Sequence, residues 1–270
     1  MAITYYMVQI PPVLLFIFIT VCAGSFAAFS TFLVRKYIVV EILRSHNEVT
    51  GFVFIAIAGF YSLLLSFVVF VVWGQFNETR VNVSNEGSSA MGLYRDIKYY
   101  PDTVVSKNLT TVYLDFVYNV VDEEFPNMEI MKPSRKTPES LDKVFFEMER
   151  LKPQTPYQTQ LVAEMFRHLN QLVTYRGLRT MSMETEIPPP IWLPIIFGGI
   201  ITMIIAMLLD IEHSRMHIAI NSLLAIFISM LIFIIIVLDH PYTGVIKLKP
   251  KAYREIFTLE SWTNDQAIKK

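Results

Sequence analysis

The stretch GFYSLLLSFVVFVVWGQFNETR, residues 59–80, is apolar up to Trp73 and then becomes polar without a proline or another turn signal. Its apolar part extends back to Gly51, so the run of residues 51–73 approaches the ~20 residues with which a helix crosses the hydrocarbon core. After Trp73 only isolated glycines interrupt the pattern, and each costs only ~1 kcal/mol relative to alanine. We therefore predict one helix that spans a membrane and continues into water, with Trp73 at the interface.

Three further apolar runs have the length of a membrane span. They occupy residues 12–34, 191–209 and 218–238, and none contains an internal charge. The first run is longer than the ~7–15 residues of a signal-peptide core and follows no basic residue, so we expect it to remain as an anchor. Since 53% of the residues are also hydrophobic, the sequence predicts an all-α membrane protein with four transmembrane helices.

The polar segment between the second and third spans, residues 74–187, also has a helical pattern. Apolar residues recur there at spacings of three and four, at Leu109, Val112, Phe116 and Val120. This stripe predicts a helix that starts near Pro101 and ends at Phe125, because the next residue is Pro126. We therefore expect a helical extramembrane domain between the second and third spans.

Two later helices in this segment have recognisable starts. Thr137 and Thr155 each directly precede a proline. Threonine is a favoured N-cap residue and proline is favoured at the first helical position, so each pair predicts a helix start. The last helix is predicted to be long, with a stripe formed by Tyr157, Leu161, Met165, Leu169 and Leu172. The expected division of the chain is residues 1–73 for the first two spans, 74–187 for the helical domain, 188–240 for the last two spans and 241–270 for a C-terminal tail.

The second span has two faces of different character. One face repeats small residues every fourth position, at Ala58, Ser62 and Ser66. Small residues let helices approach closely in lipid, so we predict that this face packs against another helix and supports oligomerisation. The adjoining face carries Phe52, Ala56 and Phe60, which are compatible with lipid contact, a packed core or the wall of a narrow apolar constriction.

Several classes of function have little support in the sequence. The net charge of −1 offers no basic face for nucleic acid, and Cys22 is the only cysteine, which excludes an internal disulfide. No motif or spacing organises a catalytic centre or a cofactor site, so we predict no enzymatic activity and no cofactor. His213 and His217 have the spacing of a helical metal pair. Asp210 and Glu212 lie in the same turn, but no third ligand clear of the turn is nearby, so no metal site is predicted. The acidic triplet of residues 122–124 is expected to be solvated surface.

Four short motifs carry a resemblance to a known family. They are G-F-Y followed by W-x-Q-F-N at residues 73–77, HNEVTGF at residues 46–52, EEFP at residues 123–126 and DHPYTG at residues 239–244. With the four-span layout, they resemble the bacterial bestrophin-like domain proteins and, more distantly, the bestrophins. The resemblance covers nearly the whole chain.

The resemblance implies a function and a set of residues for it. Bestrophins are pentameric anion channels whose second span lines a hydrophobic neck, so the similarity implies neck positions for Phe52, Ala56 and Phe60. Ala56 stands where bestrophins have a bulky residue, and the apolar run after G-F-Y is about one helical turn longer. A wider or differently placed constriction is therefore expected. The tail lacks the dense acidic run with which bestrophins bind calcium, so we expect no calcium site.

The leading prediction is an oligomeric channel, with pentamers favoured by the resemblance, that conducts small anions such as chloride in a bacterial inner membrane. Gln75 and Asn77 would extend the pore lining beyond the neck, whereas a ring of Glu78 or Glu86 would favour cations. A cation channel of the same architecture therefore remains an alternative. A non-conducting sensor or scaffold that acts through its helical domain is another. The predicted partners are lipid, further copies of the chain and inorganic ions.

Two arguments on orientation disagree. Arg35, Lys36 and Arg44 lie in the first connection, and the positive-inside rule then places the helical domain outside the cytoplasm. The bestrophin resemblance and the basic residues of the tail argue for a cytoplasmic domain. Because the connection after the first span usually dominates, the expectation is an extracytoplasmic domain.

Overall fold

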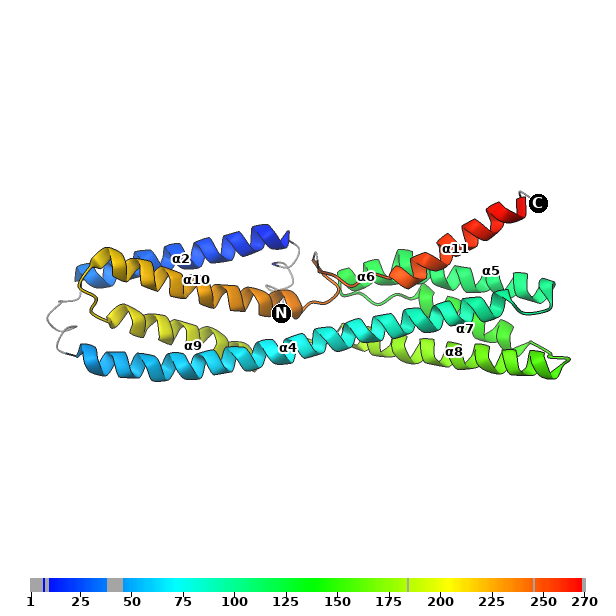
Figure 1. The fold of residues 1–270 in the computed structure, drawn as a ribbon, viewed down its shortest axis with the longest axis horizontal. Helices are drawn as coiled ribbons and strands as arrows, with labels where there is room; N and C mark the ends of the chain where they lie inside the picture. Colours follow the sequence, from blue (N-terminus) through cyan, green and yellow to red (C-terminus); the bar gives the residue numbers. More distant parts are fainter. Residues whose placement is uncertain (1–6, 8–9, 38–45, 184, 245, 269–270) are drawn as a thin grey trace. The chain divides into compact units, whose positions relative to one another are not determined.

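The computed structural model describes residues 7, 10–37, 46–183, 185–244 and 246–268, and side chains up to Ser261 (Figure 1). Within these residues, four helices are long and apolar enough to cross a membrane: α2 (Pro12–Tyr37), α4 (Asn47–Lys98), α9 (Pro189–Leu208) and α10 (Ser214–Leu238). The predicted all-α fold with four transmembrane helices is therefore confirmed. Arg44 and Ser45 lie outside the described residues.

The predicted continuation of the second span is also confirmed, because α4 is a single helix of 52 residues. Its first half is apolar and its second half is polar, and Gly74 lies at the change without breaking the helix. A helix keeps its backbone hydrogen bonds internal in both lipid and water, so only the side chains need to change.

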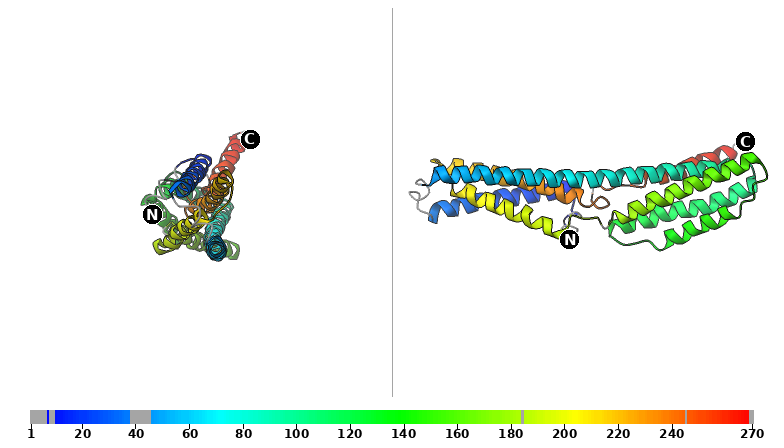
Figure 2. Two further views of the ribbon diagram at one scale, coloured as in Figure 1. Left: turned by 90° about the vertical axis from the view of Figure 1, so that its left-hand side faces the viewer. Right: turned by 90° about the horizontal axis from the view of Figure 1, so that it is seen from below.

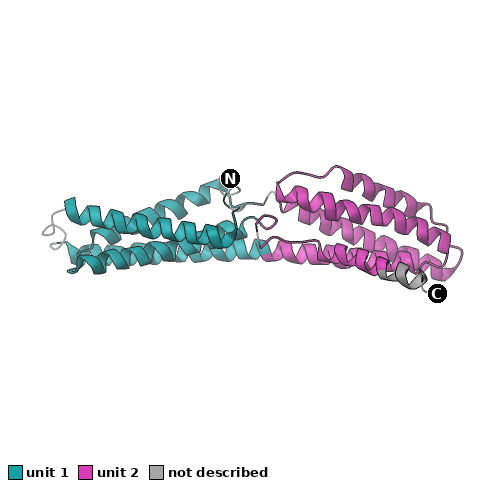
Figure 3. Cartoon of the chain, turned by 90° about the horizontal axis from the view of Figure 1, so that it is seen from above, with its two compact units in different colours: residues 1–76, 186–240 teal, residues 77–185, 241–270 magenta. Residues whose placement is uncertain are grey.

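The chain forms two compact units, coloured separately in Figure 3. The first unit comprises residues 1–76 and 186–240, and the second comprises residues 77–185 and 241–270. Helix α4 contributes to both. The second unit also contains α5 (Thr103–Asn119), the π-helical turn η1 (Val120–Glu124), α6 (Phe125–Glu129), α7 (Lys136–Glu149), α8 (Pro156–Met181) and α11 (Lys251–Ile268).

The first unit is a bundle of spanning helices in which α2 runs beside α10 (Figures 1 and 2). Small and polar residues form this contact. A Cβ atom on Gly24 would lie 3.1 Å from the Ile226 side chain, and Asn221 donates a hydrogen bond to the Thr31 hydroxyl at 3.1 Å. In the absence of a hydrophobic effect inside lipid, such close packing and hydrogen bonds hold helices together.

Helix α4 is attached to α9 in the same way. The Tyr61 hydroxyl donates to the Ile195 carbonyl at 2.9 Å, and a Cβ atom on Gly198 would lie 2.6 Å from the Tyr61 ring. Gly198 therefore makes room for the tyrosine. At the end of the bundle, the Asn47 side chain accepts from the Asp210 N–H at 2.8 Å, which joins the start of α4 to the connection after α9.

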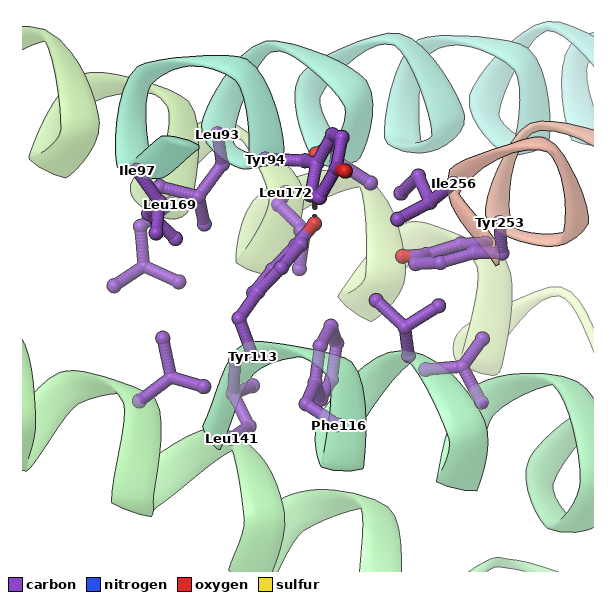
Figure 4. Packing of buried hydrophobic residues seen from close by; sticks show 14 of the residues in the cluster. Leu93, Tyr94, Ile97, Tyr113, Phe116, Leu141, Leu169, Leu172, Tyr253 and Ile256 are labelled. Atoms are coloured by element: carbon purple, nitrogen blue, oxygen red, sulfur yellow. Dashed lines mark hydrogen bonds between the residues drawn. The ribbon is translucent and has the colours of Figure 1, made fainter. Parts of the chain in front are cut away.

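The second unit has one apolar core, to which α4, α5, α7, α8 and α11 all contribute. Figure 4 shows Tyr113, Phe116 and Tyr253 meeting at its centre, where the Tyr113 hydroxyl donates to the Ala90 carbonyl at 2.7 Å. Tyr253 comes from α11, so the C-terminal helix is part of this core.

The expected end of the helix that begins near Pro101 is wrong. Instead of stopping at Phe125, the chain passes through η1 and continues as α6 to Glu129. The Phe125 N–H bonds to the Val120 carbonyl in the i→i+5 pattern of a π-helix. Pro126 then stands at the start of α6, where a missing N–H costs little.

Of the two predicted helix starts, one is confirmed and one is wrong. Thr155 caps α8 as expected, with its hydroxyl accepting from the Gln158 N–H in a full capping box. Helix α7 begins at Lys136, before Thr137, and the Ser134 hydroxyl accepts from the Thr137 N–H at 3.3 Å. The Thr137 side chain is buried and donates instead to the Asn119 carbonyl of α5, at 3.4 Å.

Candidate functional site

The predicted neck residues lie on an exposed face of α4. Phe52 is 67% exposed and Phe60 is 76% exposed, and Ala56 between them is exposed as well. The same face continues with Leu63, Phe67 and Phe70, each exposed. The spacing of three and four residues continues in the sequence from Phe60 to Phe70, which is the signal that extends the predicted face.

The opposite face of α4 is buried within the first unit. Tyr61, Leu65, Val68 and Val72 are at most 6% exposed and follow each other at spacings of four, three and four. Helix α4 therefore turns one stripe toward α9 and leaves the other unpartnered by the described part of the chain.

The other residues of α4 that were predicted to line the pore or to pack differ in their exposure. Asn77 is half buried and accepts from Arg80 at 3.0 Å, and Gln75 is half buried and lies on a different side of the helix from Phe52 and Ala56. Among the predicted packing residues, Ala58 is half buried, whereas Ser62 and Ser66 are exposed. The Ser62 hydroxyl donates to the Gly59 carbonyl within the helix.

The structure excludes Glu86 from any ring of exposed acidic residues. Glu86 is fully buried in the second unit, where both of its oxygens bind Arg179, at 2.5 and 3.0 Å. The Tyr253 hydroxyl donates to the same carboxylate at 2.7 Å. Of the two acidic residues expected at the pore, only Glu78 is exposed.

Arg179 is the centre of a buried ion-pair network. It is fully buried and also binds Glu124 at 2.8 Å, and Glu124 in turn accepts two bonds from Arg176, at 2.6 and 3.2 Å. The Arg179 guanidinium stacks over the Phe125 ring at 4.6 Å. Glu124, expected on the surface, is only 2% exposed, so that expectation is wrong for this member of the acidic triplet.

Two of the motifs that carry the family resemblance, EEFP and DHPYTG, both contact Arg179. The EEFP motif supplies Glu124 and Phe125 through η1 and α6. From the DHPYTG motif, Tyr242 donates to the Arg179 carbonyl at 3.1 Å. The π-helical turn shifts the register so that Glu124 faces inward, a change that regular helical periodicity does not reveal.

The electrostatics of the network favour its charged forms. Burial lowers the pKa of Arg179, but Glu86 and Glu124 outweigh burial and raise that pKa above its ordinary value. Burial raises the pKa of Glu124, but Arg179 and Arg176 outweigh it and hold the pKa below the ordinary value. Burial, followed by the charge of Glu86, raises the pKa of Tyr253, so its hydroxyl stays protonated as a donor. The network is an ionised structural centre.

The other polar candidates have structural partners. His217 is fully buried, with Nε2 3.0 Å from the Ala206 carbonyl and Nδ1 3.2 Å from the Arg35 guanidinium. Arg35 also donates to the Ile211 carbonyl at 2.6 Å. Within the described residues, no group of three or more His, Cys, Asp or Glu side chains is placed to hold a metal ion.

Asp239 connects the ends of the third and fourth spans. It is 5% exposed and accepts from the Ile187 N–H at 2.8 Å, just before α9. Burial raises the pKa of Asp239 to about 6, against the opposing effect of that hydrogen bond. The carboxyl group is therefore poised to titrate at mildly acid pH.

Comparisons with known proteins agree with the geometry. A family model described as "Bestrophin-like domain" matches residues 21–253. A search of curated proteins found no match. A variant of a bacterial bestrophin homologue from Klebsiella pneumoniae superposes with a TM-score of 0.67 at 14% identity, covering 89% of this chain and 96% of that one. Another crystal structure of that homologue gives a TM-score of 0.64 at 14% identity, covering 89% and 95%.

The similarity to these solved structures shows the fold, and the match to the family model shows the family relationship. The match extends from the middle of α2 to the first turn of α11 and includes every element between them. This chain is a multi-pass membrane protein and belongs to the bestrophin-like domain family.

Proposed function

We propose that this chain is the subunit of an oligomeric ion channel in which α4 lines an axial pore. The observation that carries the proposal is the exposed apolar face of α4, which includes Phe52, Ala56 and Phe60. Copies of the chain arranged around an axis would turn these faces toward one another and form an apolar neck. The family resemblance supports the same positions, and pentamers and a bacterial inner membrane are proposed on that basis.

The polar half of α4 supports a pore over simple lipid contact. Beyond Trp73, this side of the helix carries exposed Val81 and Ser88 and half-buried Asn77 and Asn85. If α4 only contacted lipid, nothing would require the polar half of the helix, beyond the bilayer, to keep this side uncovered by the rest of the chain. An apolar stretch followed by amide and hydroxyl groups suits an ion path that passes a neck and enters an aqueous vestibule.

Anion conduction is favoured over cation conduction by the position of Glu86. Its charge is paired with Arg179 inside the second unit, which leaves Glu78 as the exposed acid of the two expected at the pore. Backbone dipoles and the amide group of Asn77 solvate either sign of ion, whereas Gln75 lies on another side of the helix. Because Glu86 is removed from the pore and the family resemblance favours anions, we propose a chloride-type anion as the conducted species.

The test is a recording of purified protein in a planar bilayer under a potassium chloride gradient. Discrete current steps with a reversal potential near that of chloride would support the proposal. A reversal potential near that of potassium would identify a cation channel, and Glu78→Gln would then move it toward zero. If no current appears under any gradient while the protein is folded and oligomeric, the non-conducting sensor or scaffold replaces the channel.

A further inference from the structure

A basic cavity lies within the second unit, between one face of α4 and the beginning of α11. Its volume is about 520 Å³, within the range of ~300–1,000 Å³ that is usual for small-molecule sites. Helix α4 contributes residues at positions i, i+3, i+4, i+7 and i+8, from Arg80 to Ser88, which form one side of the helix. Residues 246–253 form the other wall.

The cavity carries more positive charge than its surroundings neutralise. Four of its lining residues are basic: Arg80, Lys247, Lys249 and Lys251. Lys247 binds Glu129 at 2.6 Å, and Arg80 donates to the uncharged side chain of Asn77. Among the described residues, no carboxylate lies within ion-pair distance of Lys249 or Lys251. The positive charges of Arg80, Lys249 and Lys251 therefore remain available to a ligand.

The backbone adds to this charge. Lys251, Ala252 and Tyr253 line the cavity and are the first three residues of α11, a helix of 18 residues. The Lys251 N–H donates to the Lys249 carbonyl at 2.8 Å, but the N-terminus of a helix still carries a partial positive charge that favours an anion together with the lysine side chains. On the opposite wall the Ser84 hydroxyl offers a further donor, whereas the Ser88 hydroxyl donates to the Ser84 carbonyl at 3.0 Å.

The walls of the cavity are held in place before any ligand binds. A Cβ atom on Gly87 would lie 2.6 Å from the Cβ atom of Ala252, so the glycine allows α4 and α11 to approach closely. Next to Ala252, the Tyr253 hydroxyl is bound to Glu86. A preformed site loses less conformational freedom on binding than a flexible one.

We propose that this cavity binds a phosphate-bearing anion. Three unneutralised cationic side chains, a helix N-terminus and the Ser84 hydroxyl match the charge and the several acceptor oxygens of a phosphate monoester or diphosphate. The group can belong to a lipid headgroup or to a soluble phosphorylated compound. Arg80 follows Trp73 by seven residues of α4, or about 10 Å of helix, which keeps its side chain within reach of headgroups. The proposal does not depend on ion conduction.

The experiment measures binding to the full-length protein in detergent by titration calorimetry. One arm uses inorganic pyrophosphate, and the other uses dihexanoyl phosphatidic acid, with dihexanoyl phosphatidylcholine for comparison. The test variant is Lys249→Ala with Lys251→Ala. The matched control is Lys107→Ala with Lys143→Ala, which removes the same charge from exposed positions on α5 and α7.

Saturable binding to the wild type is expected, with a Kd that rises about tenfold or more in the test variant. The control variant and the charge-preserving Lys249→Arg with Lys251→Arg should bind like the wild type. Tighter binding of phosphatidic acid than of pyrophosphate would assign the site to a lipid, and the reverse order to a soluble ligand. Equal losses in the test and control variants, or no binding of either probe to the wild type at millimolar concentration, would overturn the proposal.

Because this assay involves no membrane and no current, its failure would leave the proposed channel function untouched. Conversely, a protein that binds phosphate but never conducts would retain the site as a property of the second unit.

Discussion

At the scale of the residue, the charged groups inside the second unit matter most, because burial changes what they can do. Arg179 is enclosed by Glu86, Glu124 and Phe125, and its positive charge is paired with both carboxylates. A buried ion pair is weak evidence for stability as a whole, since its desolvation offsets much of its attraction. Removing one partner is different, because the other charges then remain buried and unpaired.

We expect Arg179→Met to destabilise the second unit strongly, by about 3–5 kcal/mol, since it leaves two carboxylates without their main cation. Chemical unfolding of the purified protein, followed by fluorescence, measures this change. Arg150→Met is the control, because Arg150 is exposed and contacts the partly exposed Glu147 and the ring of Phe146. A midpoint for Arg179→Met that equals that of the control would contradict the central role of the network.

Asp239 provides a prediction for pH. Its pKa in the folded protein is about 6, above the ordinary 3.8, because burial disfavours the charged form. The folded state therefore has its full contribution from this group below pH ~4 and loses it as the pH rises through about 6. Asp239→Asn keeps an oxygen that can accept from Ile187 and cannot ionise, so it should stabilise the protein at pH 8 by roughly 1–3 kcal/mol.

The measurement for Asp239→Asn is the thermal unfolding midpoint at pH 5 and pH 8. The gain over the wild type should be larger at pH 8. Asp142→Asn, on an exposed position of α7, controls for the loss of a carboxylate. Parallel shifts of wild type and Asp239→Asn between the two pH values would show that Asp239 does not titrate in this range.

At the scale of the element, α4 unites two environments in one helix. Its buried stripe packs against α9 in the first unit and against the core in the second, while the exposed stripe is left open. Because Phe52 and Phe60 are apolar and exposed, they must contact either lipid or further copies of the chain. The two possibilities make different predictions for a truncated side chain.

If α4 lines the neck, Phe60→Ala should increase single-channel conductance or leak, because a wider apolar constriction is easier to hydrate. Ion flux through reconstituted vesicles measures the effect. Phe29→Ala on α2 is a matched control, since Phe29 is 61% exposed on a different spanning helix. An identical flux for both variants and the wild type would favour lipid contact for Phe60.

At the scale of the whole molecule, the predicted association of subunits rests on the small face of α4. Ser62 and Ser66 are exposed in the single chain, so a neighbouring subunit is free to occupy this face. We expect the wild type to be an oligomer and Ser62→Leu to dissociate it, because the larger side chain blocks close approach. Native mass spectrometry in detergent decides this, with Ser25→Leu on an exposed position of α2 as control.

The orientation can be tested by cysteine labelling, for which the sequence suggests Ser45 in the first connection and Ser134 in the loop before Thr137. Ser45 lies outside the described residues, and Ser134 is half buried and hydrogen-bonded to Glu123. Cys22 is exposed on α2 and should be replaced by serine first. Lys132 and Glu212 are exposed in connections that follow the second and third spans, respectively.

A cysteine at Lys132 should react with an impermeant maleimide in intact cells, whereas one at Glu212 should react only after lysis. This is the result that the basic residues of the first connection predict. The opposite pattern would place the helical domain in the cytoplasm, in agreement with the bestrophin resemblance and the basic tail.

The sequence by itself determined the four spans, the unbroken α4 and the capped start of α8, because these features depend on local composition and on helical periodicity. Only the tertiary structure decided which charges are buried. Glu86 and Glu124 have the appearance of surface residues in the sequence, and Arg179 lies 93 positions from the first and 55 from the second. Their burial depends on side chains that pack from distant parts of the chain, and on a π-helical turn that local periodicity does not encode.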